Sequence, residues 1–306
     1  MNLRPEPLTI RPPSECRSLL LRSTRGCNWN RCKFCGVYGA LGEPQFSTRP
    51  IEDVKRDIDW YADWKFKFDT AFIGDADPLC RPIVDSVAIL AYLKERLPYL
   101  SRITAYARAG TLFKLGADGL KRLSDTGLTR VHVGLESGDL ATLKFHRKGQ
   151  SPKILIQATL WAKAAEIEVS FYVLLGLAGR DRWMEHIDGT VDVINATDPA
   201  FIRMRRIWLF TPESSQTATY CPLWDDIRSG AFIQQTPEGT IQELRRLIAR
   251  IGNVHSHLIC DHANNYLPIE GDFPADRERM LAQIDAFLAL SQEKRDQHYQ
   301  NVGSRI

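Results

Sequence analysis

Three of the seven cysteines lie close together near the start of the chain and have the spacing of metal ligands. Cys27, Cys32 and Cys35 follow a C-x4-C-x2-C pattern, and Phe34 precedes the last of them. Thiolates this close on one short loop are suited to wrapping one soft metal centre. Three ligands leave one position of the centre open, as a catalytic cluster requires. We therefore predict a metal centre on residues 27–35.

The same cysteines have other readings on sequence grounds. A C-x2-C pair is also typical of zinc sites, but zinc would need a fourth ligand, and no further cysteine or histidine lies near this loop in the sequence. Disulfides would leave one of the three thiols unpaired, and we expect no signal peptide because residues 1–10 are polar and contain prolines. A chance cluster of inert thiols is the remaining alternative.

Strands alternate with helices over residues 18–210. Apolar runs predict strands, and apolar residues at helical spacing predict the helices between them. The expected strands are 18–21, 70–73, 102–108, 130–135, 169–175 and 201–210, and the expected helices are 51–61, 81–95, 112–124, 151–165 and 181–194. Such alternation implies an α/β fold with parallel strands and right-handed crossovers. Six units suit either an open doubly wound sheet or a partial (β/α)6 TIM-like barrel.

The chain divides into three expected parts. Residues 1–16 form an irregular N-terminal arm, because four prolines exclude regular structure there. Residues 17–235 form the core. Residues 236–306 form a mainly helical C-terminal extension, with amphipathic helices at 240–251 and 275–290 and a frayed, polar end over the last fifteen residues.

The cysteine loop resembles that of the radical S-adenosylmethionine (radical SAM) superfamily. The usual spacing there is C-x3-C-x2-C, so this chain carries one extra residue, and Phe34 and Tyr38 match the aromatic pattern around the motif. The resemblance implies that Cys27, Cys32 and Cys35 hold a [4Fe-4S] cluster and that S-adenosylmethionine chelates the fourth iron. One electron from the cluster would then cleave the sulfonium to a 5'-deoxyadenosyl radical. The resemblance also selects the partial barrel.

In parallel barrels the active site lies at the carboxyl ends of the strands. The family resemblance implies that Asp75 or Asp77, beside Gly74, contacts the methionyl ammonium of the cofactor. Further cofactor contacts are expected at the strand ends Tyr106, Arg108, Glu136 and Gly176 and at Arg147 in the following loop. The core is distantly similar to oxygen-independent coproporphyrinogen oxidase-like members, although Tyr172 stands where that enzyme has an aspartate.

Two arginines on the last expected strand point to an anionic substrate. Arg203 and Arg205 share the face opposite Ile202 and Met204, so they would line the barrel interior. Guanidiniums are costly to bury without anionic partners, and we predict that they hold carboxylate or phosphate groups. Residues 260–266 form a polar cluster that is either a lid carrying His262 or a loop bonded to its own backbone.

Composition places few limits on function. The 306 residues are 44% hydrophobic and carry a net charge of +3, with a pI near 8.4 and dispersed Lys and Arg, so nucleic-acid binding is not expected. No apolar run approaches the length of a membrane span. Free cysteines and the expected lack of an export signal predict a cytoplasmic protein.

We predict a radical SAM enzyme of oxidoreductase type that acts on a small molecule and receives electrons from a donor such as flavodoxin or ferredoxin. The alternatives are a non-catalytic iron-sulfur electron carrier or sensor, which would need a fourth protein ligand, and a tRNA-modifying radical SAM enzyme. Zinc-stabilised RNA binding would need a basic face with exposed aromatic residues, and Lys and Arg do not cluster strongly enough for it.

Overall fold

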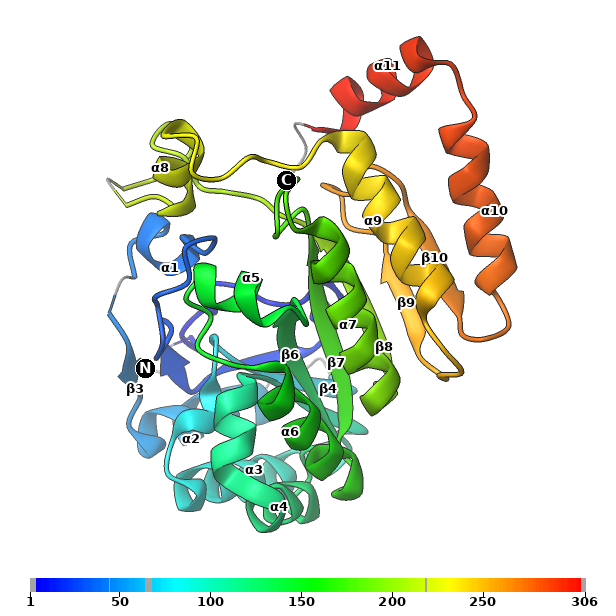
Figure 1. Ribbon diagram of the computed structural model, residues 1–306. Helices are drawn as coiled ribbons and strands as arrows, with labels where there is room; N and C mark the ends of the chain where they lie inside the picture. Colours follow the sequence, from blue (N-terminus) through cyan, green and yellow to red (C-terminus); the bar gives the residue numbers. More distant parts are fainter. Residues whose placement is uncertain (1–3, 44, 64–67, 218, 304–306) are drawn as a thin grey trace.

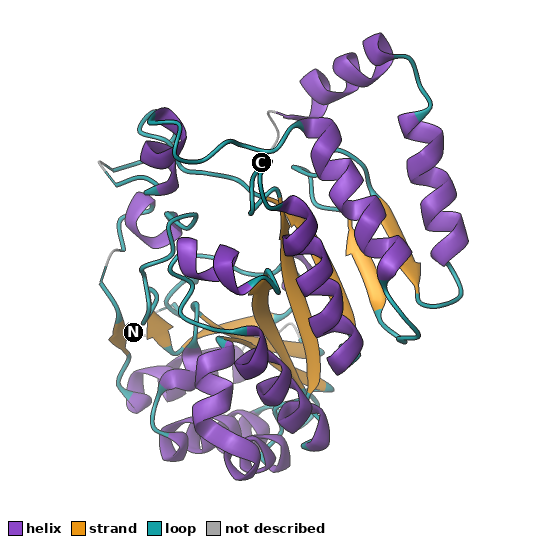
Figure 2. Cartoon of the chain, in the orientation of Figure 1, coloured by secondary structure: helices purple, strands orange, loops and turns teal. Residues whose placement is uncertain are grey.

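One twisted sheet organises the protein in its computed structural model, which describes residues 4–303 apart from 44, 64–67 and 218. Figure 2 shows the sheet with helices packed along it. Its strands are, in spatial order, β1 (Leu19–Arg22), β4 (Thr70–Gly74), β5 (Arg102–Ala107), β6 (Arg130–Glu136), β7 (Glu168–Leu175), β8 (Phe201–Arg206), β9 (His257–Cys260) and β10 (Ile269–Asp272). Neighbours from β1 to β9 are parallel, and β10 is antiparallel to β9.

The crossover helices run beside the parallel strands (Figure 1). They are α2 (Ile51–Ala62), α3 (Ile83–Arg96), α4 (Ala109–Asp125), α6 (Pro152–Ala164) and α7 (Trp183–Thr197). Two of them begin at recognisable signals, since Pro50 precedes α2 and the hydroxyl of Ser151 caps α6 by accepting from the amide of Ile154. The predicted α/β fold, a partial barrel with parallel strands, is confirmed.

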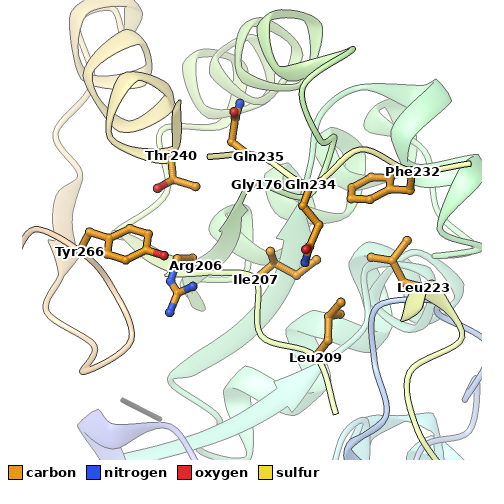
Figure 3. Close-up of a pocket in the computed structure, with 10 residues that line it drawn as sticks. All are labelled: Gly176, Arg206, Ile207, Leu209, Leu223, Phe232, Gln234, Gln235, Thr240 and Tyr266. Carbon is orange, nitrogen blue, oxygen red and sulfur yellow. The ribbon is translucent and has the colours of Figure 1, made fainter. Parts of the chain in front are cut away.

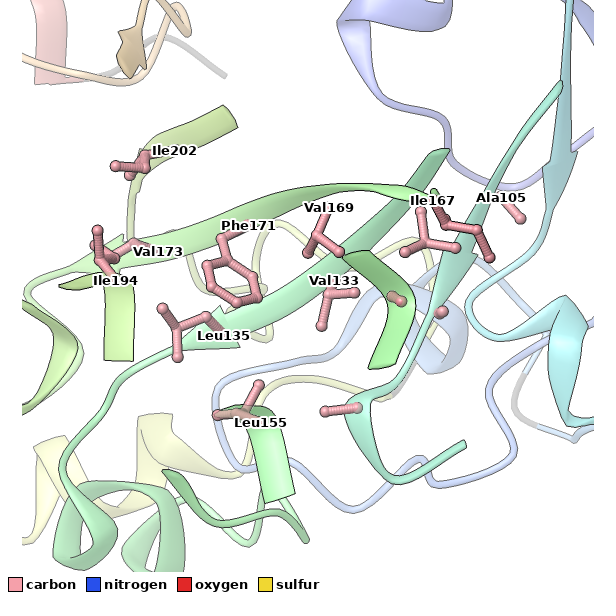
Figure 4. Packing of buried hydrophobic residues seen from close by; sticks show 14 of the residues in the cluster. Ala105, Val133, Leu135, Leu155, Ile167, Val169, Phe171, Val173, Ile194 and Ile202 are labelled. Carbon is pink, nitrogen blue, oxygen red and sulfur yellow. The ribbon is translucent and has the colours of Figure 1, made fainter. Parts of the chain in front are cut away.

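The two faces of the sheet differ in chemistry. Apolar side chains fill the face toward the helices, where Figure 4 shows Val133, Leu135, Phe171, Val173 and Ile202 in one packed cluster. Full burial of each such side chain stabilises the fold by roughly 1.5–3 kcal/mol. The opposite face carries the polar and aromatic residues of the barrel interior. Strand alternation thus separates a structural face from a face that is available for chemistry.

The N-terminal arm closes one end of the barrel interior. Its short helix η1 (Pro13–Glu15) inserts Glu15, which is fully buried and lies 3.1 Å from Nε2 of His132 on β6. The hydroxyl of Ser18 donates to the same carboxylate at 2.6 Å. Farther along the arm, Glu6 forms ion pairs with Arg22 and Arg25. The arm is irregular apart from η1 and is held by charged contacts rather than by pairing with the sheet.

Several elements differ from the sequence prediction. The C-terminal extension contains β9 and β10 besides α9 (Pro237–Arg250), α10 (Arg277–Leu288) and α11 (Gln292–Gly303), so the sheet has eight strands instead of six. The expected fraying of the last fifteen residues is wrong for 292–303, because Tyr299 packs against Tyr266 and Phe287. β8 ends at Arg206, not at residue 210. After Arg206 the chain turns away from β7 and continues as a loop toward the cysteines.

Three short helices gather at the carboxyl end of the strands (Figure 1). They are α1 (Val37–Ala40), α5 (Leu140–Phe145) and α8 (Leu223–Arg228), and none of them was expected from the sequence. A two-residue ladder of β2 (Thr24–Arg25) with β3 (Ser47–Thr48) brackets the cysteine loop. Among the described residues, no helix combines the length and the apolar character needed to cross a bilayer.

Candidate functional site

The cysteine loop lies between β2 and α1, at the carboxyl end of the sheet. Cys27, Cys32 and Cys35 are free, half-buried thiols. The backbone tightens around them, since the amide of Asn30 donates to Sγ of Cys27 at 3.4 Å and the amide of Cys35 donates to the carbonyl of Cys32 at 3.1 Å. Asn30 takes a left-handed φ of 41°, which asparagine tolerates better than most residues. The loop is therefore compact in spite of its extra residue.

A small hydrophobic cluster supports the loop from below. It consists of Phe34, Leu177, Leu209, Cys221, Leu223 and Phe232, and it packs against Cys32 and Cys35. Burial raises the pKa of Cys35 to about 12 and also raises the pKa of Cys32. Bare thiols at these positions stay protonated at neutral pH, and binding to a metal is what deprotonates such groups. The donor set of three thiols on one supported loop fits an iron-sulfur cluster.

The geometry of the thiols is also informative. Within the described ranges, no three His, Cys, Asp or Glu side chains converge on one metal-ion position. Each thiolate of a four-iron cluster ligates a different iron, so a cluster does not require such convergence.

A fourth thiol lies near the loop although it is distant in sequence. Cys80 follows β4 in the short helix η2 (Pro78–Cys80), and the side chain of Asn28 hydrogen-bonds it. Burial first, and then the charges of Asp77 and Cys27, raise the pKa of Cys80 to about 12. Sequence spacing gave no sign of this neighbour, since 45 or more residues separate it from the motif.

The loop after β4 holds two buried aspartates that differ in the charge of their partners. Oδ2 of Asp75 accepts from Nε and Nη2 of Arg22 and from the amide of Gly26, and Oδ1 accepts from the amide of Thr9. Asp77 accepts from the side chains of Asn28 and Thr111 and from the amide of Arg108. Oδ1 of each aspartate has one donor and keeps one acceptor position, but Asp75 is already paired with a guanidinium.

At Gly74 the arm comes close to β4. An added Cβ there would lie 2.5 Å from Cδ2 of Leu8. Leu8 therefore covers Gly74, and a side chain at this position would displace the end of Leu8.

Two predicted residues, Tyr106 on β5 and Arg108 directly after it, have different roles. Tyr106 lies on the interior face, where its ring packs edge-on against Phe72 at 5.0 Å and His132 at 6.0 Å. Burial raises the pKa of Tyr106 well above its usual value, so its hydroxyl stays protonated. Arg108 lies over the ring of Trp29, 4.6 Å from its centroid, and Nη2 donates to the carbonyl of Lys148 at 3.0 Å. It thereby ties the cysteine loop to residues 146–150.

Glu136 at the end of β6 is buried in an ion pair that the sequence analysis missed. Nζ of Lys148 lies 2.9 Å from its Oε1. Although burial lowers the pKa of Lys148, the charges of Glu136 and Cys32 raise it overall, so the lysine is a cation beside the cysteine loop. A Cβ on Gly134 would lie 2.2 Å from Oε1 of Glu136 and 2.8 Å from Nζ of Lys148. A side chain at 134 would therefore displace the ends of this pair.

The neighbouring Arg147, which the sequence analysis singled out, has an exposed side chain. Its contribution to the site is through the backbone, because its carbonyl accepts from the indole Nε1 of Trp29 at 2.7 Å. The pattern RKGQ does not reveal which of its two cations turns inward, and in the structure it is Lys148 that pairs with Glu136.

The arginines of β8 face the barrel interior as expected. Arg203 is buried, and its Nε donates to the hydroxyl of Ser170 at 3.0 Å. Arg205 lies over the ring of Tyr172 at 5.5 Å, and its nearest carboxylate is the exposed Asp261 at 3.9 Å. Burial lowers the pKa of Arg203, as expected for a cation without a close carboxylate.

His262 lies near Arg203 and Arg205, within the polar segment 260–266. Burial and then the guanidinium of Arg205 lower the pKa of His262, and its Nδ1 lies 2.6 Å from Oδ1 of Asn264. The side chains of Asn264 and Asn265 hydrogen-bond the backbone of β8, at Arg206 and Met204 among others. The segment is thus a loop bonded to the strand beside it.

Gly176, after β7, is bonded to the C-terminal extension. Its amide donates to Oε2 of Glu243 on α9 at 2.7 Å, with φ at the glycine of 80°. Glu243 is fully buried, and its other oxygen accepts from Nε2 of Gln235 at 3.0 Å. Burial raises the pKa of Glu243 to about 7.

A cavity of about 170 Å³ opens beside Gly176. Figure 3 shows Arg206, Tyr266 and Thr240 on one side of it and Leu209, Leu223 and Phe232 on the other. Leu209, Leu223 and Phe232 also belong to the hydrophobic cluster under the cysteine loop. The cavity therefore reaches from the extension to the underside of that loop.

Comparison with known proteins defines the class. The radical SAM superfamily matches residues 21–190, which include the cysteine motif and the strands from β4 to β7. The chain belongs to this superfamily, whose cofactors are a [4Fe-4S] cluster and S-adenosylmethionine. No protein of curated function matches the sequence.

Solved structures show the same fold at low sequence identity. Methylornithine synthase (PylB) is 17% identical with a TM-score of 0.53, over 87% of this chain and 68% of that one. Coproporphyrinogen III oxidase (HemN) from Escherichia coli is 13% identical with a TM-score of 0.56, over 81% of this chain and 52% of that one. The methyltransferase TsrM from Kitasatospora setae, solved with tryptophan and a SAM analogue, is 18% identical with a TM-score of 0.53, over 71% and 40%. The chain spans less than two thirds of the last two proteins.

Proposed function

We propose that this protein is a radical SAM enzyme in which Cys27, Cys32 and Cys35 ligate the cluster and in which the substrate is a small anionic molecule. The observation that carries the proposal is the position of the three thiols. They lie on one supported loop at the carboxyl end of a parallel sheet, beside the buried Glu136–Lys148 ion pair.

The strand ends offer a distinct contact for each part of the cofactor. Asp77 suits the methionyl ammonium better than Asp75, because Asp75 is already paired with the guanidinium of Arg22, whereas the partners of Asp77 are a hydroxyl and amides. Glu136 can accept hydrogen bonds through its second oxygen, because Lys148 contacts the first. The protonated hydroxyl of Tyr106 can donate toward the ribose or the carboxylate of the cofactor.

When bound, the reduced cluster supplies the electron that cleaves S-adenosylmethionine to methionine and a 5'-deoxyadenosyl radical. The role of the chain is to position and to shield. Phe34 and its hydrophobic cluster keep water away from the underside of the loop. Arg108, stacked on Trp29, fixes the loop against residues 146–150. Such fixed contacts hold the bound groups in reacting geometry.

Arg203 and Arg205 support an anionic substrate. Neither guanidinium has a carboxylate within 3.5 Å in the described part of the chain, and both are largely shielded from water. Such cations bind carboxylate or phosphate strongly, since the charge-assisted hydrogen bonds then repay their desolvation. His262 beside Arg205 would add one more polar contact.

The test is an assay of 5'-deoxyadenosine. The protein is purified without oxygen, reconstituted with iron and sulfide, and mixed with dithionite and S-adenosylmethionine, and the product is measured by chromatography. The wild type should form it, and the Cys27→Ala/Cys32→Ala/Cys35→Ala variant should form none and bind no cluster. Four irons without cleavage in the wild type would contradict the proposal and favour an electron carrier, and zinc in place of iron would contradict both.

Cys80→Ala and Cys221→Ala are the matched controls, because Cys80 and Cys221 are further thiols beside the loop. If three cysteines suffice, each variant retains four irons and forms 5'-deoxyadenosine at the wild-type rate. Loss of the cluster in either variant would instead assign a fourth protein ligand, as the electron-carrier alternative requires.

A further inference from the structure

The N-terminal arm reaches the carboxyl end of the sheet, close to the cysteine loop. The amide of Thr9 donates to Oδ1 of Asp75 at 3.1 Å, and the amide of Gly26 donates to Oδ2 of the same carboxylate at 3.3 Å. Gly26 directly precedes Cys27 in the chain. A single side chain, that of Asp75, thus connects the arm to the loop that carries the thiols.

The arm also covers the interior face of β4. Phe72 and Gly74 share this face by strand alternation, and the ring of Phe72 packs against Tyr106 inside the barrel. Leu8 is half-buried there, and its Cδ2 lies 2.5 Å from the position that a Cβ on Gly74 would take. The proposed function assigns the methionyl ammonium to Asp77, shortly after Gly74. Leu8 therefore stands beside the methionine end of the proposed cofactor site.

One carboxylate anchors this part of the arm to the core. Oε1 of Glu6 lies 3.0 Å from Nη1 of Arg22 and 2.7 Å from Nε of Arg25. Its Oε2 lies 3.1 Å from Nε of Arg49. Although burial raises the pKa of Glu6, the hydrogen bond from Arg25 and the charges of the three arginines lower it overall, so the carboxylate is ionised. Arg22 and Arg49 are buried, and loss of the carboxylate would leave them without this partner.

We propose that residues 5–10 of the arm form a wall of the S-adenosylmethionine site at its methionine end. Leu8 lines this wall, and Glu6 is a positioning residue that holds it in place. The inference rests on the proposed function, which puts the ammonium group at Asp77. A wall of this kind excludes water from the charged end of the cofactor, and contacts between charged groups are stronger where water is excluded.

The experiment measures ligand binding by cluster-loaded protein without a reductant, so that the cofactor stays intact. Anaerobic calorimetry gives dissociation constants for S-adenosylmethionine and for 5'-methylthioadenosine, which lacks the amino acid part. The variants are Glu6→Gln and Leu8→Ala. Their matched controls are Glu52→Gln and Val84→Ala, at exposed positions of α2 and α3. Hydrogen–deuterium exchange of residues 4–18, followed by mass spectrometry, reports separately whether the arm is held.

We expect Glu6→Gln to speed the exchange of the arm amides, because the arm loses its anchor. Leu8→Ala should leave this exchange slow, since Glu6 and Thr9 keep their contacts. Both variants should raise the dissociation constant of S-adenosylmethionine by about fivefold or more, and that of 5'-methylthioadenosine by less than about twofold. Both controls should behave as the wild type in binding and in exchange.

Unchanged binding of S-adenosylmethionine in the two variants would overturn the wall, and so would an equal loss of affinity for the two ligands. Slow exchange of the arm in Glu6→Gln would refute the role of Glu6 as its anchor. A wild-type protein that carries the cluster but binds no S-adenosylmethionine would instead contradict the proposed function. The two failures are therefore distinguishable.

Discussion

At the scale of single residues, the site depends on close packing around Glu136. Lys148 reaches its carboxylate across Gly134, where a Cβ has no room. We predict that Gly134→Ala lowers the free energy of unfolding by about 1–3 kcal/mol, because the pair must shift or separate. Urea unfolding measures this. Gly110→Ala is the control, since a Cβ at this position of α4 meets nothing within 4 Å; it should be neutral or slightly stabilising. Equal effects of the two substitutions would contradict the argument.

The sequence located the strand-end residues but not their partners. Glu136, Tyr106 and Arg203 lie on the interior side because strand alternation is a local rule. Lys148 and Cys80 were missed because their roles depend on how two loops meet, which spacing does not encode. The contacts of these residues with S-adenosylmethionine remain a prediction.

At the scale of elements, a buried carboxylate joins α9 to the end of β7. The pKa of Glu243 is raised from 4.5 to about 7, so the folded protein binds a proton more tightly than the unfolded chain does. Its stabilising contribution is complete below pH 4.5 and is lost as the pH rises to about 7. The loss is roughly 3 kcal/mol for a shift of this size.

Glu243→Gln removes this titration. We predict that the difference in free energy of unfolding between wild type and variant changes by roughly 3 kcal/mol from pH 4.5 to 7. The wild type becomes less stable relative to the variant as the pH rises. Urea unfolding across this range measures it. Glu278→Gln, an exposed position of α10, should leave the pH dependence unchanged. A Glu243→Gln curve parallel to the wild type would refute the assignment.

The elements were predictable where periodicity was long. The parallel strands from β1 to β8 and their crossover helices all lie where apolar patterns placed them, with ends that differ by a few residues. β9 and β10 were missed because four residues give too short an alternation to separate strand from loop. α11 is polar on nearly all sides, and its few packed residues, such as Tyr299, are set by tertiary contacts.

At the scale of the whole molecule, the sheet continues across residue 235, where the core was expected to end. β9 pairs with β8, and Glu243 accepts from Gly176. We predict that a chain ending at residue 235 aggregates, because the edge of β8 is exposed and the amide of Gly176 loses its acceptor. A chain ending at residue 290 keeps the sheet and should have the same oligomeric state as the 306-residue chain. Size-exclusion chromatography and urea unfolding distinguish them, and a monomeric, cooperatively unfolding 1–235 chain would contradict this prediction.

The pairing of β8 also constrains how substrate preference can change during evolution or in the laboratory. The strand that carries Arg203 and Arg205 is the same strand on which the C-terminal extension is built. A C-terminal segment taken from another superfamily member cannot be grafted at residue 235 without a β8 edge that matches it. If Arg203 and Arg205 bind substrate as proposed, variation in preference is reached more readily by point substitution at 203, 205 and their neighbours than by exchange of segments, and libraries for redesign belong on this strand.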